Sequence, residues 1–160
     1  MRDPVQLLAF GFGSGLSPRA PGTAGSVAAI LPFLMFQHLP LWQYAAVVFV
    51  AMLAGFWICG EASRRLKVHD HPGIVWDEFV GLWIALFALP AGWLWIALGF
   101  LLFRVFDILK PWPINWLDQH VEGGVGIMVD DVLAGFMACA CLQLANYYGL
   151  LDQVLPELAL

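Results

Sequence analysis

The stretch IVWDEFVGLWIALFALPAGWLWIALGFLLF, Ile74–Phe103, decides the fold of this chain. It is apolar over nearly its whole length, and it is longer than the roughly 20 residues that one membrane-crossing helix needs. Pro90, Ala91 and Gly92 interrupt it, and such a Pro–Gly pattern is typical of a turn. The stretch can therefore form one tilted helix or two short helices joined as a hairpin.

The distribution of charge favours the hairpin. Loops rich in Lys and Arg prefer the cytoplasmic side of a membrane. The seven basic residues lie before the first apolar segment, between the second and third, and just after the third; they are Arg2, Arg19, Arg64, Arg65, Lys67, Arg104 and Lys110. All seven share one side only if Ile74–Phe103 enters the membrane and returns, so we predict a hairpin here.

The composition indicates an integral membrane protein. The chain has 160 residues, of which 61% are hydrophobic and 12% charged, whereas a soluble domain is about 45–50% apolar and about 25% charged. Three further apolar segments lack the alternation of strands; they are Ala24–Leu39, Leu41–Cys59 and Val132–Leu151. We expect one all-α domain over residues 1–160, a compact membrane bundle with short spans and re-entrant or hairpin helices. The net charge of −5 without a basic run argues against nucleic acid as a partner, and the oligomeric state stays open.

Two pairs of neighbouring carboxylates stand next to apolar segments, where charge is costly. Asp77 and Glu78 form one pair, and Asp130 and Asp131 form the other. We expect both pairs at helix starts, where the helix dipole favours an anion by only about 0.3–1 kcal/mol. A divalent cation explains two adjacent carboxylates better, and Mg²⁺ prefers such hard oxygen ligands. The four acids are therefore candidate metal ligands.

Basic side chains follow the predicted hairpin. Arg104, Asp107 and Lys110 recur every three residues, which places them on one helix face and predicts an Arg104–Asp107 ion pair. Pro111 and Pro113 should end that helix. These bases can bind an anion, or they can anchor the helix by reaching the lipid headgroups, and both interpretations can hold together.

The glycine-rich stretch GFGSGLSPRAPGTAGS, Gly11–Ser26, precedes the first apolar segment. Glycines let backbone N–H groups approach an anion, and a helix N-terminus favours negative charge. We predict phosphate contacts from Gly22, Thr23, Gly25 and Ser26, with Thr23 or Ser26 as the helix cap. The alternative is an ordinary turn, because the stretch lacks the GK[ST] ending of a nucleotide-binding loop.

A second phosphate-binding pattern is judged accidental. Cys59 and Arg65 fit the Cys-x5-Arg pattern of cysteine phosphatases. That chemistry needs a thiolate in a phosphate cradle, whereas Cys59 ends an apolar segment and Glu61 would repel phosphate. The acidic and basic clusters instead suit a phosphate ester carried on a lipid.

Four motifs, in this order, closely resemble the phosphatidylglycerophosphatase A family of bacteria; they are GFGSGLSPRAPGTAGS, HDHPGIVWDEFVG, FRVFDILKPWPI and GGVGIMVDDVLAG. The resemblance covers about residues 7–148 and is specific because all four are in register. It implies a Mg²⁺-dependent enzyme of the bacterial inner membrane that removes the terminal phosphate of phosphatidylglycerophosphate. It also implies an all-α fold with helices packed around a central one.

A mechanism follows as an expectation. Mg²⁺ would be held by some of Asp77, Glu78, Asp130 and Asp131, and the phosphate by Lys110, Arg104 and the backbone of Gly22–Ser26. Water would attack phosphorus, with Asp107 as base, metal ligand or partner of Arg104.

Three alternatives remain. An aspartyl-phosphate route ranks lower because the DxDx[TV] pattern is absent. The substrate can be another lipid phosphate such as phosphatidate. In a different class, the chain can be a small ion- or proton-coupled transporter.

Overall fold

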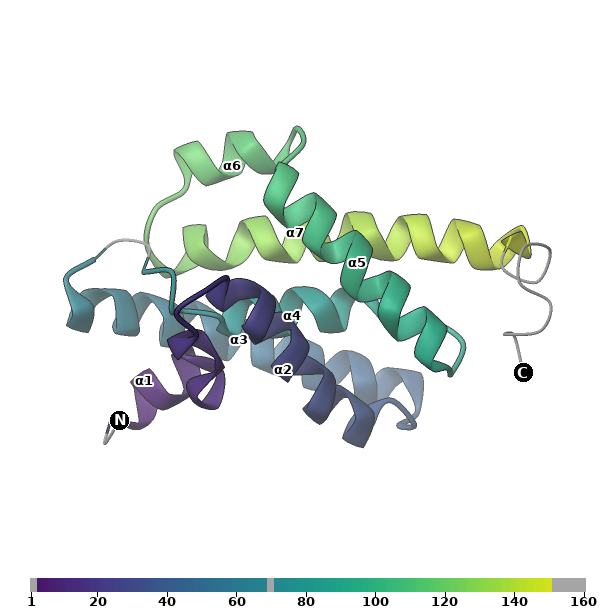
Figure 1. The fold of residues 1–160 in the computed structure, drawn as a ribbon, viewed down its shortest axis with the longest axis horizontal. Helices are drawn as coiled ribbons and strands as arrows, with labels where there is room; N and C mark the ends of the chain where they lie inside the picture. The colour runs from purple at the N-terminus through teal and green to yellow at the C-terminus, as the bar shows by residue number, and fades with distance from the viewer. Residues whose placement is uncertain (1–2, 69–70, 151–160) are drawn as a thin grey trace.

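The computed structural model describes residues 3–68 and 71–150, and within them all regular structure is helical (Figure 1). The elements in chain order are α1 (Pro4–Ala9), the 3₁₀ segment η1 (Gly11–Leu16), α2 (Pro21–Phe36), α3 (Leu41–Leu66), α4 (Trp76–Ala85), α5 (Trp93–Leu109), α6 (Ile114–His120) and α7 (Gly123–Tyr147). The predicted all-α bundle is confirmed.

The predicted hairpin is also confirmed. Helix α4 ends at Ala85 and α5 begins at Trp93, so the chain turns back around Pro90 and Gly92. Gly92 has a φ of 148°, in the region that favours glycine, which explains why glycine stands at the start of α5.

Helix α4 is the centre of the bundle. Every residue from Asp77 to Ala85 is buried, and α4 packs against α7, α2, α3 and α5. Two buried aromatic side chains form hydrogen bonds that link α4 to α2 and to α3. Trp83 donates its indole N–H to the Ala29 carbonyl at 2.9 Å, and Tyr44 donates its hydroxyl to the Trp83 carbonyl at 2.7 Å.

Within residues 3–68 and 71–150, two helices are long and apolar enough to cross a bilayer. Helix α3 has 26 residues and α7 has 25, against a requirement of about 20. Large apolar side chains face outward from several helices, among them Leu31 (69% exposed), Trp42 (71%) and Phe49 (55%). Such an apolar exterior does not suit contact with water. The chain is a membrane protein.

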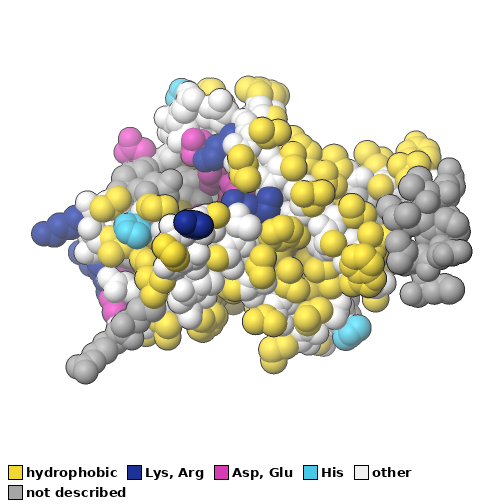
Figure 2. Space-filling view, in the orientation of Figure 1, with side chains coloured by type: hydrophobic (Ala, Val, Ile, Leu, Met, Phe, Trp, Pro, Cys, Tyr) yellow, Lys and Arg dark blue, Asp and Glu magenta, His cyan; other side chains and the backbone are white. Residues whose placement is uncertain are grey.

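The charged groups of the described chain gather at one end of the bundle. Figure 2 shows the Lys, Arg, Asp and Glu side chains on one half of the molecule and a mainly apolar surface over the other half. Helices α3 and α5 end on the charged side, and α2, α4 and α7 begin there. This arrangement is the one that the charge distribution predicted.

Candidate functional site

A polar pocket lies at the charged end of the bundle. It has a volume of about 380 Å³ and is bounded by the first turn of α2, the start of α4 and parts of α5, α6 and α7. Eight charged side chains line it, namely Asp77, Glu78, Asp107, Asp118, Asp130, Asp131, Arg104 and Lys110. Six acids against two bases leave the lining with four negative charges in excess, when all groups are ionised.

Arg104 neutralises two of these acids. Its Nη1 lies 2.7 Å from Glu78 Oε2 and 2.5 Å from Asp107 Oδ2, which confirms the predicted Arg104–Asp107 pair. The Ser26 hydroxyl also donates to Glu78 Oε2. Nε of Arg104 is buried without a hydrogen-bond partner in the described part of the chain. The guanidinium therefore retains an unused donor beside the pocket.

Lys110 neutralises a second pair of acids. Its Nζ donates to Asp118 Oδ1 at 2.6 Å and to Asp130 Oδ2 at 2.8 Å. Burial alone would lower the pKa of Lys110, but its bonds and attraction to the two carboxylates outweigh burial and raise the pKa above its usual range. Lys110 therefore stays protonated at physiological pH.

Asp131 lacks such a neutralising partner. Asp131 is 3% exposed, and no Lys or Arg forms an ion pair with it among residues 3–68 and 71–150. Asp131 Oδ2 and the neighbouring Asp130 Oδ1 are both buried without hydrogen-bond partners in that part of the chain. Two orphaned carboxylate oxygens are costly unless something else binds them.

These oxygens suit a hard cation such as Mg²⁺, and the pocket brings all four candidate ligands together. Within the described residues, however, no three His, Cys, Asp or Glu side chains already form a metal-binding group. The ion pairs explain this, because Glu78 is held by Arg104 and Asp130 by Lys110. The metal site stays a prediction that requires these carboxylates to turn.

The glycine-rich stretch contributes less to the pocket than predicted. Gly22 lines the pocket, whereas Thr23, Gly25 and Ser26 do not. Ser26 is fully buried and supports Glu78, and a Cβ at Gly25 would lie 2.6 Å from Val75 Cβ, so Gly25 allows close packing. Phosphate contacts from the backbone of these three residues remain untested predictions, and their positions favour a supporting role.

The predicted cap of α2 is wrong. The helix begins at Pro21, and its N-cap residue Ala20 makes no side-chain cap hydrogen bond. Proline fits the first helical position because its φ is already helical and it lacks an N–H that needs a partner. Thr23 and Ser26 consequently lie inside the helix.

The predicted start of the last helix is also wrong. Helix α7 begins at Gly123, so Asp130 and Asp131 lie within the helix rather than at its first turn. The glycines form part of α7 because they allow close approach to α3, where a Cβ on Gly124 would lie 2.7 Å from Gly60 N. The first turn of α4, by contrast, does contain Asp77 and Glu78 as predicted.

Asp118 is a pocket residue that was not predicted as one. It lies in α6, and it reaches Lys110 across the turn between α5 and α6. Helical spacing could not reveal this contact, because the two residues belong to different helices. The only signal was an acid beside an apolar run.

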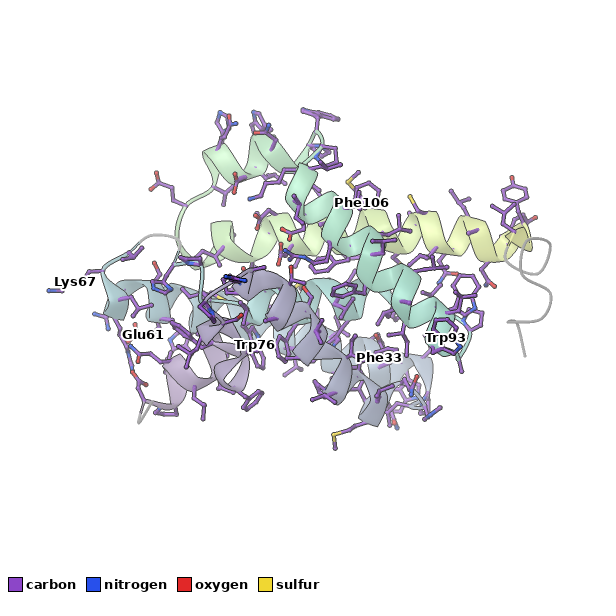
Figure 3. The ribbon with its side chains drawn as sticks, in the orientation of Figure 1. Phe33, Glu61, Lys67, Trp76, Trp93 and Phe106 are labelled. Atoms are coloured by element: carbon purple, nitrogen blue, oxygen red, sulfur yellow. The ribbon has the colours of Figure 1, made fainter. Side chains whose placement is uncertain are left out.

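The cysteine-phosphatase pattern is rejected by the structure. Cys59 is fully buried within α3. Arg65 pairs with Asp3 and Glu61 at 2.5 and 2.7 Å. Figure 3 shows Glu61 at the end of the molecule that also carries Lys67. Cys59 and Arg65 therefore do not form a phosphate cradle.

Comparison with known proteins finds one family model and two relatives that carry the same name. The family model described as Phosphatidylglycerophosphatase A matches residues 7–146. A protein of that name from Escherichia coli is 48% identical, over 92% of this chain and 87% of its own. One of the same name from Haemophilus influenzae is 45% identical, over 92% of each.

A third relative carries a different name. It comes from Bacteroides thetaiotaomicron, is provisionally named a phosphatidylinositol-3-phosphatase, and is 41% identical over 88% of this chain and 92% of its own. No solved structure matches the chain at comparable stringency. The family model and the names of the Escherichia coli and Haemophilus influenzae relatives agree with the motifs, and this chain belongs to the phosphatidylglycerophosphatase A family.

Proposed function

We propose that the chain removes the terminal phosphate from phosphatidylglycerophosphate and releases phosphatidylglycerol and inorganic phosphate. The names of the two relatives that are 48% and 45% identical support this activity. The observation that carries it is the pocket of about 380 Å³, in which acids and two cations meet at one end of a membrane bundle. A lipid phosphate ester can reach such a place from the plane of the membrane.

In this proposal the two basic residues hold the phosphate. Arg104 offers its unused guanidinium donors, and Lys110 offers its charge from the other side of the pocket. The amide of Gly22, in the first turn of α2, adds a donor that the helix itself leaves unpaired. Together these groups orient the ester for attack by water from one direction.

In this proposal, four acids of the site bind a metal ion and a fifth can accept a proton. Asp77, Glu78, Asp130 and Asp131 would hold Mg²⁺, which when bound draws charge from phosphate oxygens and makes water more acidic. Asp107 lies beside Arg104, where it can accept a proton or only position the guanidinium. The chain's own contribution is to keep unneutralised carboxylate oxygens next to the phosphate.

Phosphate release tests the activity and the substrate together. Purified protein in detergent micelles is given phosphatidylglycerophosphate, phosphatidate or phosphatidylinositol 3-phosphate, with Mg²⁺ or with a chelator. We expect Mg²⁺-dependent release from the first lipid. The third lipid is included because of the name of the Bacteroides relative. Release from only one of the other lipids would show that this lipid, and not phosphatidylglycerophosphate, is the substrate. Ion flux in sealed vesicles without any hydrolysis would support a transporter.

A matched pair of variants tests the site. Asp131→Asn removes a buried carboxylate of the pocket, whereas Glu122→Gln changes an exposed acid outside the pocket lining. We expect Asp131→Asn to abolish phosphate release while the protein still inserts, and Glu122→Gln to stay active. Full activity of Asp131→Asn would remove this residue from the mechanism.

The proposed location is the bacterial inner membrane, with several spans and the pocket facing the cytoplasm. The support is the gathering of basic residues at the pocket end of the bundle (Figure 2). Single cysteines at Lys67 and at Ala91 test it, because these positions lie at opposite ends of α3–α5. A membrane-impermeant thiol reagent added to intact spheroplasts should label Ala91→Cys and spare Lys67→Cys, in a background that lacks the natural cysteines. The opposite pattern would invert the topology.

A further inference from the structure

Helices α2 and α5 leave an apolar seam between them that begins at the pocket. Both helices pack on α4, but they contact each other only over a short stretch. They run in opposite directions (Figure 1). A Cβ on Gly22 at the start of α2 would lie 3.2 Å from Arg104 Nη2 near the end of α5. At the other end, Phe33 and Ile96 line one cavity.

The seam is polar at the pocket and apolar further along. At the pocket it is formed by Gly22 and Arg104. Helical spacing groups apolar side chains along one side of each helix, which is the side of Arg104 on α5 and the side next to Gly22 on α2. These are Val27, Ile30 and Leu34 on α2, and Ala97, Phe100 and Leu101 on α5.

Several of these side chains are open to the membrane rather than packed in the core. Val27 is 52% exposed, Leu34 43% and Leu101 56%. Figure 2 shows apolar surface extending from the charged pocket across this part of the molecule. An apolar surface that is continuous with a phosphate pocket matches a molecule with an anionic head and a hydrocarbon tail.

The length of the seam fits the reach of one acyl chain. Gly22 and Phe33 are eleven residues apart in α2, which corresponds to about 16 Å along the helix axis. Half of the hydrocarbon core measures about 15 Å. Phe33 and Trp93 mark the far end in Figure 3. There a cavity of about 350 Å³, lined also by Trp95 and Leu89, offers space for the end of a chain.

We propose that the α2–α5 seam holds one acyl chain of the lipid whose phosphate occupies the pocket. This inference rests on the proposed function. The exposed apolar face of α3 is a weaker candidate, because the charged groups at its pocket-side end, Glu61, Arg64 and Arg65, already pair with one another. The seam therefore sets how the substrate is oriented and favours lipids over water-soluble phosphate esters.

A bulky side chain in the seam tests this positioning. Ala97→Trp fills an exposed position on the seam, and Ala140→Trp makes the same change at an exposed position of α7 away from it. Each variant is given dioleoyl and dihexanoyl phosphatidylglycerophosphate. Misplacing a substrate by about 1 Å can lower its rate up to about 100-fold. We expect Ala97→Trp to lower kcat/KM about tenfold for the dioleoyl lipid and less than about twofold for the dihexanoyl lipid.

The outcomes separate this inference from the proposed function. Equal losses on both lipids, or none on either, for Ala97→Trp would overturn the seam assignment while leaving the activity intact. A loss for Ala140→Trp as large as that for Ala97→Trp would do the same. Absence of hydrolysis by the unaltered protein would instead contradict the proposed function.

Crosslinking provides a readout that does not depend on turnover. Phosphatidylglycerophosphate with a diazirine halfway along one acyl chain is added at low mole fraction to phosphatidylcholine vesicles containing the protein. We expect labelled peptides from α2 and α5, and suppression of that label by unlabelled phosphatidylglycerophosphate but not by added phosphatidylcholine. Label confined to α3, or label that both lipids suppress equally, would overturn the proposal.

Discussion

Replacing Arg104 by lysine should separate its structural role from its role in binding phosphate. A single nitrogen, Nη1, contacts both Glu78 and Asp107. Nε is buried without a partner in the described chain. A lysine ammonium can replace the single bridging nitrogen, whereas it cannot reproduce the remaining guanidinium donors. Arg104→Met supplies neither function and serves as the comparison.

The two variants should differ clearly in stability. Arg104→Met leaves two largely buried carboxylates without their cation, and loss of one member of a buried ion pair costs about 3–5 kcal/mol. For a chain of this size, each kcal/mol shifts Tm by about 2–4 °C, so the expected loss is about 6–20 °C. Lysine retains at least one of the two charge-assisted contacts, so Arg104→Lys should lose about 1.5–3 kcal/mol or less.

The two variants should resemble each other in activity. Each loses at least one charge-assisted hydrogen bond to phosphate, worth about 1.5–3 kcal/mol, which corresponds to a fall in kcat/KM of about 13- to 160-fold. Thermal unfolding in detergent and phosphate release from phosphatidylglycerophosphate measure the two effects on the same preparations. Full activity of Arg104→Lys, or equal destabilisation by both substitutions, would refute this division of roles.

Three further predictions concern other parts of the molecule. Chelation of divalent cations should stop phosphate release, and added Mg²⁺ should restore it; undiminished turnover after chelation would contradict the metal prediction. Gly124→Ala should lower the stability by about 1–3 kcal/mol, because the added methyl group meets the backbone of Gly60, and an unchanged Tm would show that α3 and α7 can separate easily. Cys59→Ser should leave phosphate release per folded molecule unchanged, since Cys59 is a buried residue of α3. A large loss of kcat at unchanged stability would instead support the cysteine-phosphatase pattern.

The helical hairpin was predictable because its signals are local and strong. Pro90 and Gly92 interrupt an apolar run, and the basic residues require both ends of that run to lie on one side. The placement of Asp77 and Glu78 at a helix start follows from the same reasoning. The Arg104–Asp107 pair was predictable because residues three apart face the same side of a helix.

The other features depend on contacts between helices, which a single sequence does not reveal. The sequence suggests that the glycines before Asp130 form a flexible segment, but in the structure they permit backbone contact between α7 and α3. The sequence suggests Ser26 as a helix N-cap, but Ser26 lies inside α2 and its hydroxyl donates to Glu78. Asp118 was not assigned to the site because its contact with Lys110 crosses a turn set by prolines. In each case the deciding neighbour comes from another helix.

The position of α4 has a consequence for how the protein is assembled during synthesis. This helix begins with two buried acids, Asp77 and Glu78, and an ionised group costs up to about 2.5–3.5 kcal/mol at the centre of a membrane helix on insertion scales. The cation that pairs with Glu78 lies on α5, and much of the wall that shields α4 is α7, the last of the described helices to leave the ribosome. Nascent chains that stop before Gly123 therefore expose an acidic, unshielded helix, and quality-control proteases of the membrane should degrade them before any partial fold accumulates.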